Sequence, residues 1–209
     1  MEHKAFKDAL TEIESIGFNV SVQPTPGSVP YAIIGGRSNA RWWLVPLTSR
    51  RVAVSGLAMF QPVVRSARIF KRIAVVACWM GFYSLWTQKR LYISKSSYLS
   101  DVFGDSDLCY SFFTGTDSPH RKVAVQIMGR DGSIKGFAKV SCNPSVKPLL
   151  VHEAETLDYV STLGLKTALF PKVLFSGEVG SSRILVTDTL KTGRIKTVTI
   201  LTDAHTAFL

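Results

Sequence analysis

Lys139 and Glu153 are the two residues of this sequence whose types and spacing best fit a chemical role. Residues 149–163 repeat apolar side chains at helical spacing, and at about 100° per residue Glu153 falls roughly 40° from Leu149, within the apolar stripe. A carboxylate on the buried side of a helix needs a cationic partner, because an unpaired buried charge is costly. Lys139 is the nearest candidate upstream, so we expect the two residues to form an ion pair. An ordinary salt bridge in a sheet domain is the alternative interpretation.

The segment before this helix has the pattern of three consecutive antiparallel strands. An apolar run at 108–114 is followed by the polar turn 115–121. Residues 122–128 then alternate between the two faces of a strand. An Asp-Gly turn signal at 131–132 precedes a third strand, 133–140, which would carry Lys139.

A helix and two further strands are predicted after Lys139. Asn143 is the candidate helix N-cap with Pro144 in the first turn, and Gly164 closes the helix. We expect the stripe formed by Leu149, Thr156, Leu157, Val160 and Leu163 to be buried. Strands at 169–175 and 184–187, with a turn at 177–182 between them, complete an order of three strands, one helix and two strands.

With these elements, the chain resembles the N-terminal lobe of kinase-like phosphotransferases of the aminoglycoside and choline kinase type. The residues that carry the resemblance are Gly-Phe-Ala-Lys-Val at 136–140, Glu153 with Leu157 and Val160, Phe-Pro-Lys-Val-Leu at 170–174, and Ile-Leu-Val-Thr-Asp-Thr-Leu at 184–190. The resemblance covers about residues 108–192, and the order of elements supports it more strongly than any single motif does.

The resemblance implies a site for ATP and Mg²⁺. In this family the strand lysine binds the α- and β-phosphates, and the helix glutamate holds the lysine, which assigns these roles to Lys139 and Glu153. The turn that begins at Gly115 would cover the phosphates, although it holds a single glycine. The segment after the fifth strand would contact adenine through Asp188, Thr189 and Leu190.

The family takes its catalytic aspartate and its Mg²⁺ ligands from a helical C-terminal lobe. Only 19 residues follow Leu190, and we expect 202–209 to begin a helix rather than to form a catalytic loop. The sequence therefore predicts a lobe that does not transfer phosphate alone and exposes an apolar face. The missing lobe or a second copy of the chain would cover that face.

Charge divides the chain into two halves, which we expect to be separate modules of an α+β protein. Residues 1–100 hold 13 Lys/Arg against 4 Asp/Glu, whereas residues 101–209 hold 12 against 11, and no acidic residue lies between Ser15 and Ser100. The expected modules are a basic, mixed N-terminal one (1–100) and a kinase-like lobe (101–209) with a five-stranded antiparallel sheet and one packed helix. The basic half predicts an anionic partner, which is a phosphorylated substrate, a membrane surface or nucleic acid. Alternatively, this half packs against an acidic surface of another chain.

The first half begins with a predicted helix over 6–16, followed by a proline-rich extended stretch at 23–30. Short apolar runs at 31–34, 42–45 and 52–54 predict strands. Residues 73–86 carry no charge and are too few to span a bilayer, so a buried helix is expected there. The alternative is that Arg65, Arg68, Lys71 and Arg72 rest on anionic headgroups while the apolar segment partly inserts.

Three widely spaced cysteines and the absence of an apolar leader predict a cytoplasmic protein, with a membrane-peripheral position left open. The leading hypothesis for function is the nucleotide-binding part of a small-molecule phosphotransferase. The first hundred residues loosely resemble N-terminal regions of bacterial proteins encoded with surface-polysaccharide synthesis. The alternatives are a non-catalytic docking module and a basic binder of membranes or nucleic acid.

Overall fold

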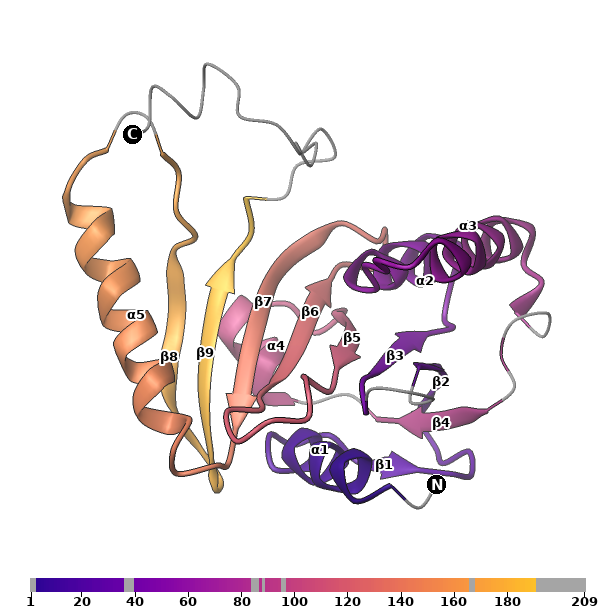
Figure 1. The fold of residues 1–209 in the computed structure, drawn as a ribbon, viewed down its shortest axis with the longest axis horizontal. Helices are drawn as coiled ribbons and strands as arrows, with labels where there is room; N and C mark the ends of the chain where they lie inside the picture. Colours follow the sequence, from indigo (N-terminus) through magenta and orange to yellow (C-terminus); the bar gives the residue numbers. More distant parts are fainter. Residues whose placement is uncertain are drawn as a thin grey trace.

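The computed structural model describes residues 3–35, 40–83, 87, 89–94, 97–165 and 168–190. Within these residues the chain is an α+β protein with five α-helices, one short 3₁₀ helix and a single nine-stranded antiparallel sheet (Figure 1). The helices are α1 (Lys4–Glu14), α2 (Arg50–Gly56), η1 (Leu57–Met59), α3 (Arg65–Met80), α4 (Ser97–Phe103) and α5 (Lys147–Thr162). The strands are β1 (Val20–Ser21), β2 (Val29–Gly35), β3 (Trp42–Pro46), β4 (Arg90–Ile93), β5 (Cys109–Phe113), β6 (Val123–Met128), β7 (Ile134–Ser141), β8 (Val173–Val179) and β9 (Ser182–Asp188).

The sheet has the strand order β1-β4-β2-β3-β5-β6-β7-β9-β8. The strands expected at 31–34, 42–45, 108–114, 122–128, 133–140 and 184–187 are all present, and β5, β6 and β7 are consecutive antiparallel neighbours as predicted. The five C-terminal strands do not form a sheet of their own, because β3 pairs with β5 through Trp43–Phe113 and Leu44–Phe112. The two halves of the chain therefore share one sheet.

The two faces of the sheet carry different helices. On one face α1 and α4 cover a core of aromatic and branched side chains that includes Phe6, Ile13, Tyr110 and Phe112. On the other face α2 and α3 cover the N-terminal strands and enclose a second cluster, which includes Ala53, Leu57 and Ala74. Helix α5 packs against β8 and β9 at the far end of the sheet (Figure 1).

The predicted strand at 52–54 is wrong, since these residues lie in helix α2. Ser49 begins that helix, with its side-chain oxygen accepting a hydrogen bond from the amide of Val52 at 3.3 Å. A serine N-cap satisfies an amide that has no partner within the helix. Of this short apolar run, Ala53 packs into the second core cluster and Val54 packs against it.

The uncharged segment 73–86 was expected to be a buried helix, and the structure corrects both its bounds and its burial. Helix α3 runs from Arg65 to Met80 and is capped by Gly81, whose φ of 81° is suited to a residue without a side chain. Only Ala74, Ala77 and Cys78 of this helix are buried. The opposite side of the helix is exposed, although it is apolar.

Helix α5 also differs from its prediction. It begins at Lys147, with Pro148 in its first turn, so Asn143 is not its N-cap and Pro144 precedes it. The expected stripe does not form the buried face, since Leu149 and Leu163 are both nearly half exposed. The buried positions are Leu150 and Ala154, which follow the stripe by about one residue, a rotation of roughly 100°.

Candidate functional site

Strand β7 directs Lys139 to the sheet face that α1 and α4 leave uncovered. Its neighbours Ala138 and Val140 are fully buried in the cluster beneath α1 and α4. Because successive side chains of a strand point to opposite faces, Lys139 lies on the other face. Gln126 on β6 identifies this as the face of α2, since its side-chain nitrogen donates to the carbonyl of Ser55 at 2.9 Å.

Helix α5 brings Glu153 onto the same face, where it forms an ion pair with Lys139 through Oε1. The predicted ion pair is therefore confirmed, and it joins α5 to β7. Both side chains remain about one third exposed, at 38% for Lys139 and 31% for Glu153. This partial exposure leaves the lysine within reach of a ligand in solvent.

A second lysine contacts the same carboxylate. Lys122, the residue before β6, lies with Nζ 3.7 Å from Oε2 of Glu153. Lys122 and Lys139 thus flank one carboxylate from neighbouring strands. Two ammonium groups with one compensating charge form a cationic site on which an anionic ligand is favoured.

Sequence reasoning did not single out Lys122, although the register of the β6–β7 hairpin could have placed it. Ala124 lies opposite Lys139. The side chain two residues before Ala124 must point to the same face of the strand. The Asp-Gly turn at 131–132 was the signal from which this register follows.

The turn 115–121 contacts α1 and the start of the 143–146 turn. Arg121 donates to the carbonyl of Ala5 and lies 4.0 Å from the carboxylate of Asp8. The side-chain amide of Asn143 donates to the carbonyl of Pro119 at 2.8 Å. Gly115 is buried, with a φ of 78°, and a Cβ there would collide with the carbonyl oxygen of Lys122. The backbone at Gly115 therefore fixes the position from which Lys122 projects.

Asp188, Thr189 and Leu190 lie at the end of β9, next to Lys172. The amide of Asp188 donates to the carbonyl of Lys172 at 3.0 Å, and the amide of Lys172 donates back to Oδ1 of Asp188 at 2.6 Å. Asp188 therefore holds the two strands together at this end, and the side chain of Leu190 is exposed. The predicted helix at 202–209 lies outside the described residues.

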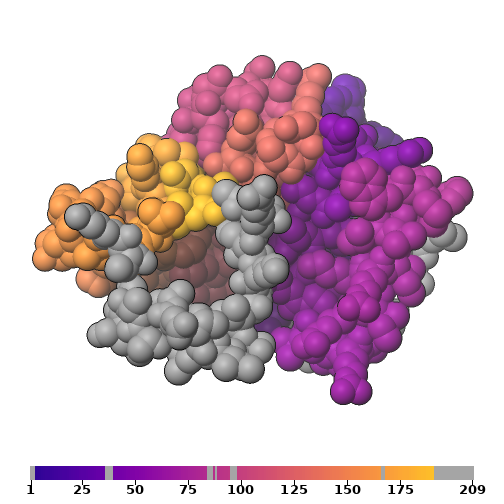
Figure 2. All heavy atoms as spheres, turned by 90° about the horizontal axis from the view of Figure 1, so that it is seen from above, coloured from indigo at the N-terminus to yellow at the C-terminus, as the bar shows by residue number. Residues whose placement is uncertain are grey.

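Figure 2 shows the C-terminal strands with α5 on one side and the α2–α3 layer on the other. Among the described residues, no three His, Cys, Asp or Glu side chains gather where they could hold a metal ion. The predicted Mg²⁺ therefore has no donor set in this part of the chain.

A buried carboxylate lies on the opposite face of the sheet. Glu12 of α1 is 4% exposed and accepts hydrogen bonds from Ser141 at 3.2 Å and from the thiol of Cys142 at 3.5 Å. Burial raises the pKa of Glu12, and the hydrogen bond from Cys142 and the nearby charge of Arg121 oppose that shift. Its second oxygen, Oε2, has no hydrogen-bond partner within the described structure. The contacts of Glu12 link α1 to the end of β7.

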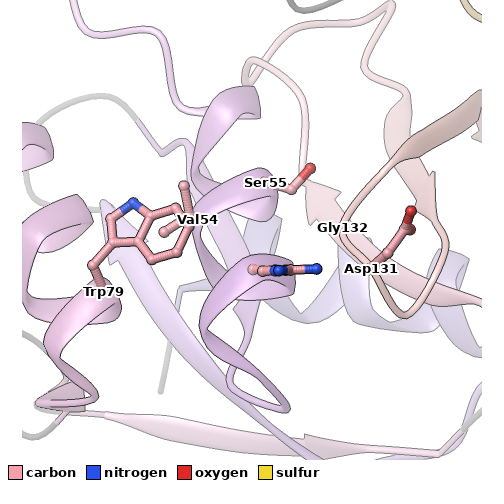
Figure 3. Close-up of a pocket in the computed structure, with 6 residues that line it drawn as sticks. Val54, Ser55, Trp79, Asp131 and Gly132 are labelled. Carbon is pink, nitrogen blue, oxygen red and sulfur yellow. The ribbon is translucent and has the colours of Figure 1, made fainter.

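A separate pocket of about 390 Å³ opens beside α2 (Figure 3). Trp79 of α3 and Asp131 and Gly132 of the β6–β7 turn stand on opposite sides of α2, which contributes Arg51, Val54 and Ser55. Asp131 accepts from the amide and hydroxyl of Ser133, so its carboxylate is already used to shape the turn. The pocket contains none of the predicted site residues.

Comparisons with protein-family models, with curated proteins and with solved structures found no match for this chain. No described helix combines the length and the apolar character that crossing a membrane requires.

Proposed function

We propose that residues 108–190 form the nucleotide-binding lobe of a kinase-like phosphotransferase that acts on a small molecule. The observation that carries the proposal is the ion pair between Lys139 of β7 and Glu153 of α5. A helix glutamate that holds a strand lysine orients its ammonium group, which suits it to bind phosphate oxygens.

The order of the elements supports this assignment. Three antiparallel strands, β5 to β7, precede α5, and the hairpin β8–β9 follows it. Strand β9 pairs with β7, the strand that carries Lys139, and Asp188 at the end of β9 lies opposite Gly136. This is the sequence of three strands, one helix and two strands on which the resemblance to the aminoglycoside and choline kinase type rests.

The residues present fit the phosphate part of ATP. In the proposed complex Lys139 binds the α- and β-phosphates, Glu153 keeps the ammonium group in place, and Lys122 adds a second positive charge. The turn that starts at Gly115 lies next to Lys122, and Asp188, Thr189 and Leu190 are assigned to the adenine side. ATP bound in this way would supply the phosphoryl group for transfer.

The acceptor hydroxyl and the Mg²⁺ are assigned to a second lobe, because the described residues offer no donor set for the metal. That lobe would cover the exposed apolar residues along α5, which include Leu149, Tyr159 and Leu163. A link to bacterial surface-polysaccharide metabolism rests on the resemblance of the first hundred residues alone. If the lobe binds no nucleotide, this apolar surface favours the docking-module alternative instead.

The proposal is tested by measuring ATP binding to the full chain by calorimetry, with and without Mg²⁺. We expect Lys139→Ala to weaken binding roughly ten- to a hundredfold, since a charge-assisted hydrogen bond contributes about 1.5–3 kcal/mol. Glu153→Ala should weaken it less, because Lys139 keeps its charge contact with the phosphates and loses only the carboxylate that orients it. Lys7→Ala is the matched control, as this exposed lysine of α1 lies away from the site.

Two outcomes would contradict the proposal. One is a wild-type chain that is folded by circular dichroism and binds neither ATP nor GTP. The other is an equal loss of affinity in Lys139→Ala and Lys7→Ala, which would show attraction to overall charge rather than to a site.

A further inference from the structure

Helix α3 buries a narrow side and exposes an apolar one. Its buried residues, Ala74, Ala77 and Cys78, pack into the second core cluster with α2. On the opposite side four large apolar side chains follow one another at spacings of four, three and four residues. They are 50–58% exposed: Ile69, Ile73, Val76 and Met80. This spacing aligns them along one line of the helix.

Further exposed apolar residues flank both ends of the helix in the sequence. Val63 and Val64 precede it and are among the most exposed apolar residues in the described chain, and Phe82 follows it with 53% exposure. Trp79 lies beside the line and is also half exposed. A run of this length exceeds the scattered apolar residues found on ordinary surfaces, so it marks a surface that meets an apolar environment.

Basic side chains border this line on one side. At about 100° per residue, Arg65, Arg72 and Arg68 fall roughly 40°, 60° and 100° to the same side of Ile69, and Trp79 falls among them. All three arginines are exposed. Lys71 is directed elsewhere, with its ammonium group donating to the carbonyl of Phe60 at 2.6 Å. No acidic residue occurs from 16 to 99, so the local field is positive.

We propose that this surface, α3 with residues 63, 64 and 82, docks on an anionic lipid bilayer with α3 lying in the plane of the interface. The apolar line enters the acyl boundary, the arginines meet the headgroups, and Trp79 lies at the depth that tryptophan prefers. With 16 residues and a rise of about 1.5 Å each, α3 covers roughly 24 Å, which is shorter than the hydrocarbon core. It therefore lies on the membrane and does not span it.

Charge and apolarity together favour the bilayer over other occupants. A nucleic acid would neutralise the arginines but would offer nothing to Ile73 or Val76. A second copy packed antiparallel along the apolar line would place the two arginine rows on the same side of the interface, with no acidic residue on α3 to compensate. An anionic bilayer satisfies both features at once. This proposal is independent of nucleotide binding, because α3 contributes no residue to the Lys139 site.

The test is flotation of the full chain with phosphatidylcholine vesicles that contain 30% phosphatidylglycerol, compared with pure phosphatidylcholine. We expect the wild type to float with the anionic vesicles and to bind the neutral ones much more weakly. Arg65→Gln with Arg72→Gln should lower the partition coefficient about thirtyfold, since each basic residue near an anionic surface contributes roughly a factor of five. Ile73→Gln with Val76→Gln should lower it at least tenfold.

Each double variant has a matched control. Lys4→Gln with Lys7→Gln removes the same charge from exposed positions of α1, and Leu149→Gln with Tyr159→Gln removes exposed apolar side chains from α5. Both controls should bind within about twofold of the wild type. The altered α3 residues are exposed, so the melting temperatures of these variants should match that of the wild type. Trp79→Phe should remove most of the blue shift in tryptophan emission that vesicles cause.

The proposal is overturned if the wild type does not float with anionic vesicles. It is also overturned if the Lys4/Lys7 control loses as much binding as the Arg65/Arg72 variant. A dimer in solution that Ile73→Gln with Val76→Gln dissociates, in a chain that does not bind vesicles, would assign the surface to a second copy. Tighter binding to RNA than to vesicles, unaffected by the Ile73/Val76 change, would assign it to nucleic acid.

Discussion

Lys122 Nζ lies 3.7 Å from Oε2 of Glu153, on the opposite side of the carboxylate from the oxygen that pairs with Lys139. One carboxylate therefore holds two lysines that come from adjacent strands. The side chain of Lys122 is 38% exposed. The ion pair between Lys122 and Glu153 therefore contributes little to stability by itself. Its importance would lie in the charge that it presents to a ligand.

We therefore predict that Lys122→Met changes the free energy of unfolding by less than about 1 kcal/mol, because exposed ion pairs contribute little. If the proposed function is right, the same change should weaken ATP binding roughly tenfold. Urea unfolding and calorimetry measure the two effects separately. Unchanged affinity in Lys122→Met, combined with lost affinity in Lys139→Ala, would limit Lys122 to holding the carboxylate.

Gly115→Ala should destabilise the protein by about 1–3 kcal/mol, the usual cost of a side chain in a strained backbone conformation. The residue combines a φ of 78° with a backbone contact to the Lys122 carbonyl that leaves no room for a Cβ. Gly104→Ala is the control, since Gly104 has a φ of 60° but no heavy atom within 4 Å of an added Cβ. An equal loss of stability in both variants would show that the contact with Lys122 has no separate effect.

Ser49→Ala should cost about 0.5–2 kcal/mol, the range measured for lost N-caps. The change removes the acceptor that holds the amide of Val52, at the start of the helix that packs against the middle of the sheet. Ser49→Asp keeps an acceptor and should retain most of the stability. Thermal and urea unfolding of the three proteins provide the comparison. A Ser49→Ala protein as stable as the wild type would mean that water replaces the cap.

The pKa of Glu12 is raised above its ordinary value of 4.5 mainly by burial, and this shift has a consequence for stability. The folded state binds the proton more tightly than the unfolded chain does. The stability from this group is therefore fully present below pH 4.5 and is lost as the pH rises through the higher folded-state pKa.

Glu12→Gln should accordingly unfold at higher urea concentration than the wild type at pH 7, and the difference should shrink as the pH falls towards 4. The amide keeps an oxygen acceptor for Ser141 and Cys142 but carries no charge to desolvate. A difference that grows on acidification would show that the carboxylate is stabilised in its charged form, contrary to the raised pKa.

Burial, followed by the charge and the hydrogen bond of Glu12, raises the pKa of the Cys142 thiol. Less thiolate is then present at a given pH, so Cys142 should react with iodoacetamide at pH 8 more slowly than a free thiol does. Glu12→Gln should speed this reaction. The measurement uses a protein in which Cys78→Ala and Cys109→Ala leave one thiol. An unchanged reaction rate in Glu12→Gln would show that the carboxylate does not raise the pKa of Cys142.

Local sequence signals were sufficient for β5, β6, β7 and β9, but not for β8, which spans Val173–Val179 instead of the predicted 169–175 and includes part of the predicted turn at 177–182. The Asp131–Gly132 turn and the alternation on both sides of it predicted β6 and β7, because a hairpin is a local structure whose register follows from its turn. The position of Glu153 within an apolar stripe predicted a lysine partner, and the pair is present although the stripe is not the buried face of α5. The hairpin needed only neighbours in the sequence, whereas Lys139 on β7 and Glu153 on α5 are 14 residues apart.

Tertiary packing decided the features that these signals misplaced. The pairing of Trp43 with Phe113 merges the two halves of the chain into one sheet, and residues 70 positions apart make that contact. Short apolar runs such as the one around Val52 fit a strand or a buried helix equally well until a surface is present to pack on.

The sequence alone determined the alternation, the turns, the basic N-terminal half and the Lys139–Glu153 pair, since these depend on side-chain chemistry over short distances. Only the tertiary structure decided that Lys122 joins that pair, that Leu149 faces solvent rather than the core, and that the apolar line of α3 is left uncovered. The reason is physical. Apolar residues in a sequence indicate that a surface is favoured to leave water, but the arrangement of the whole chain decides which element covers that surface.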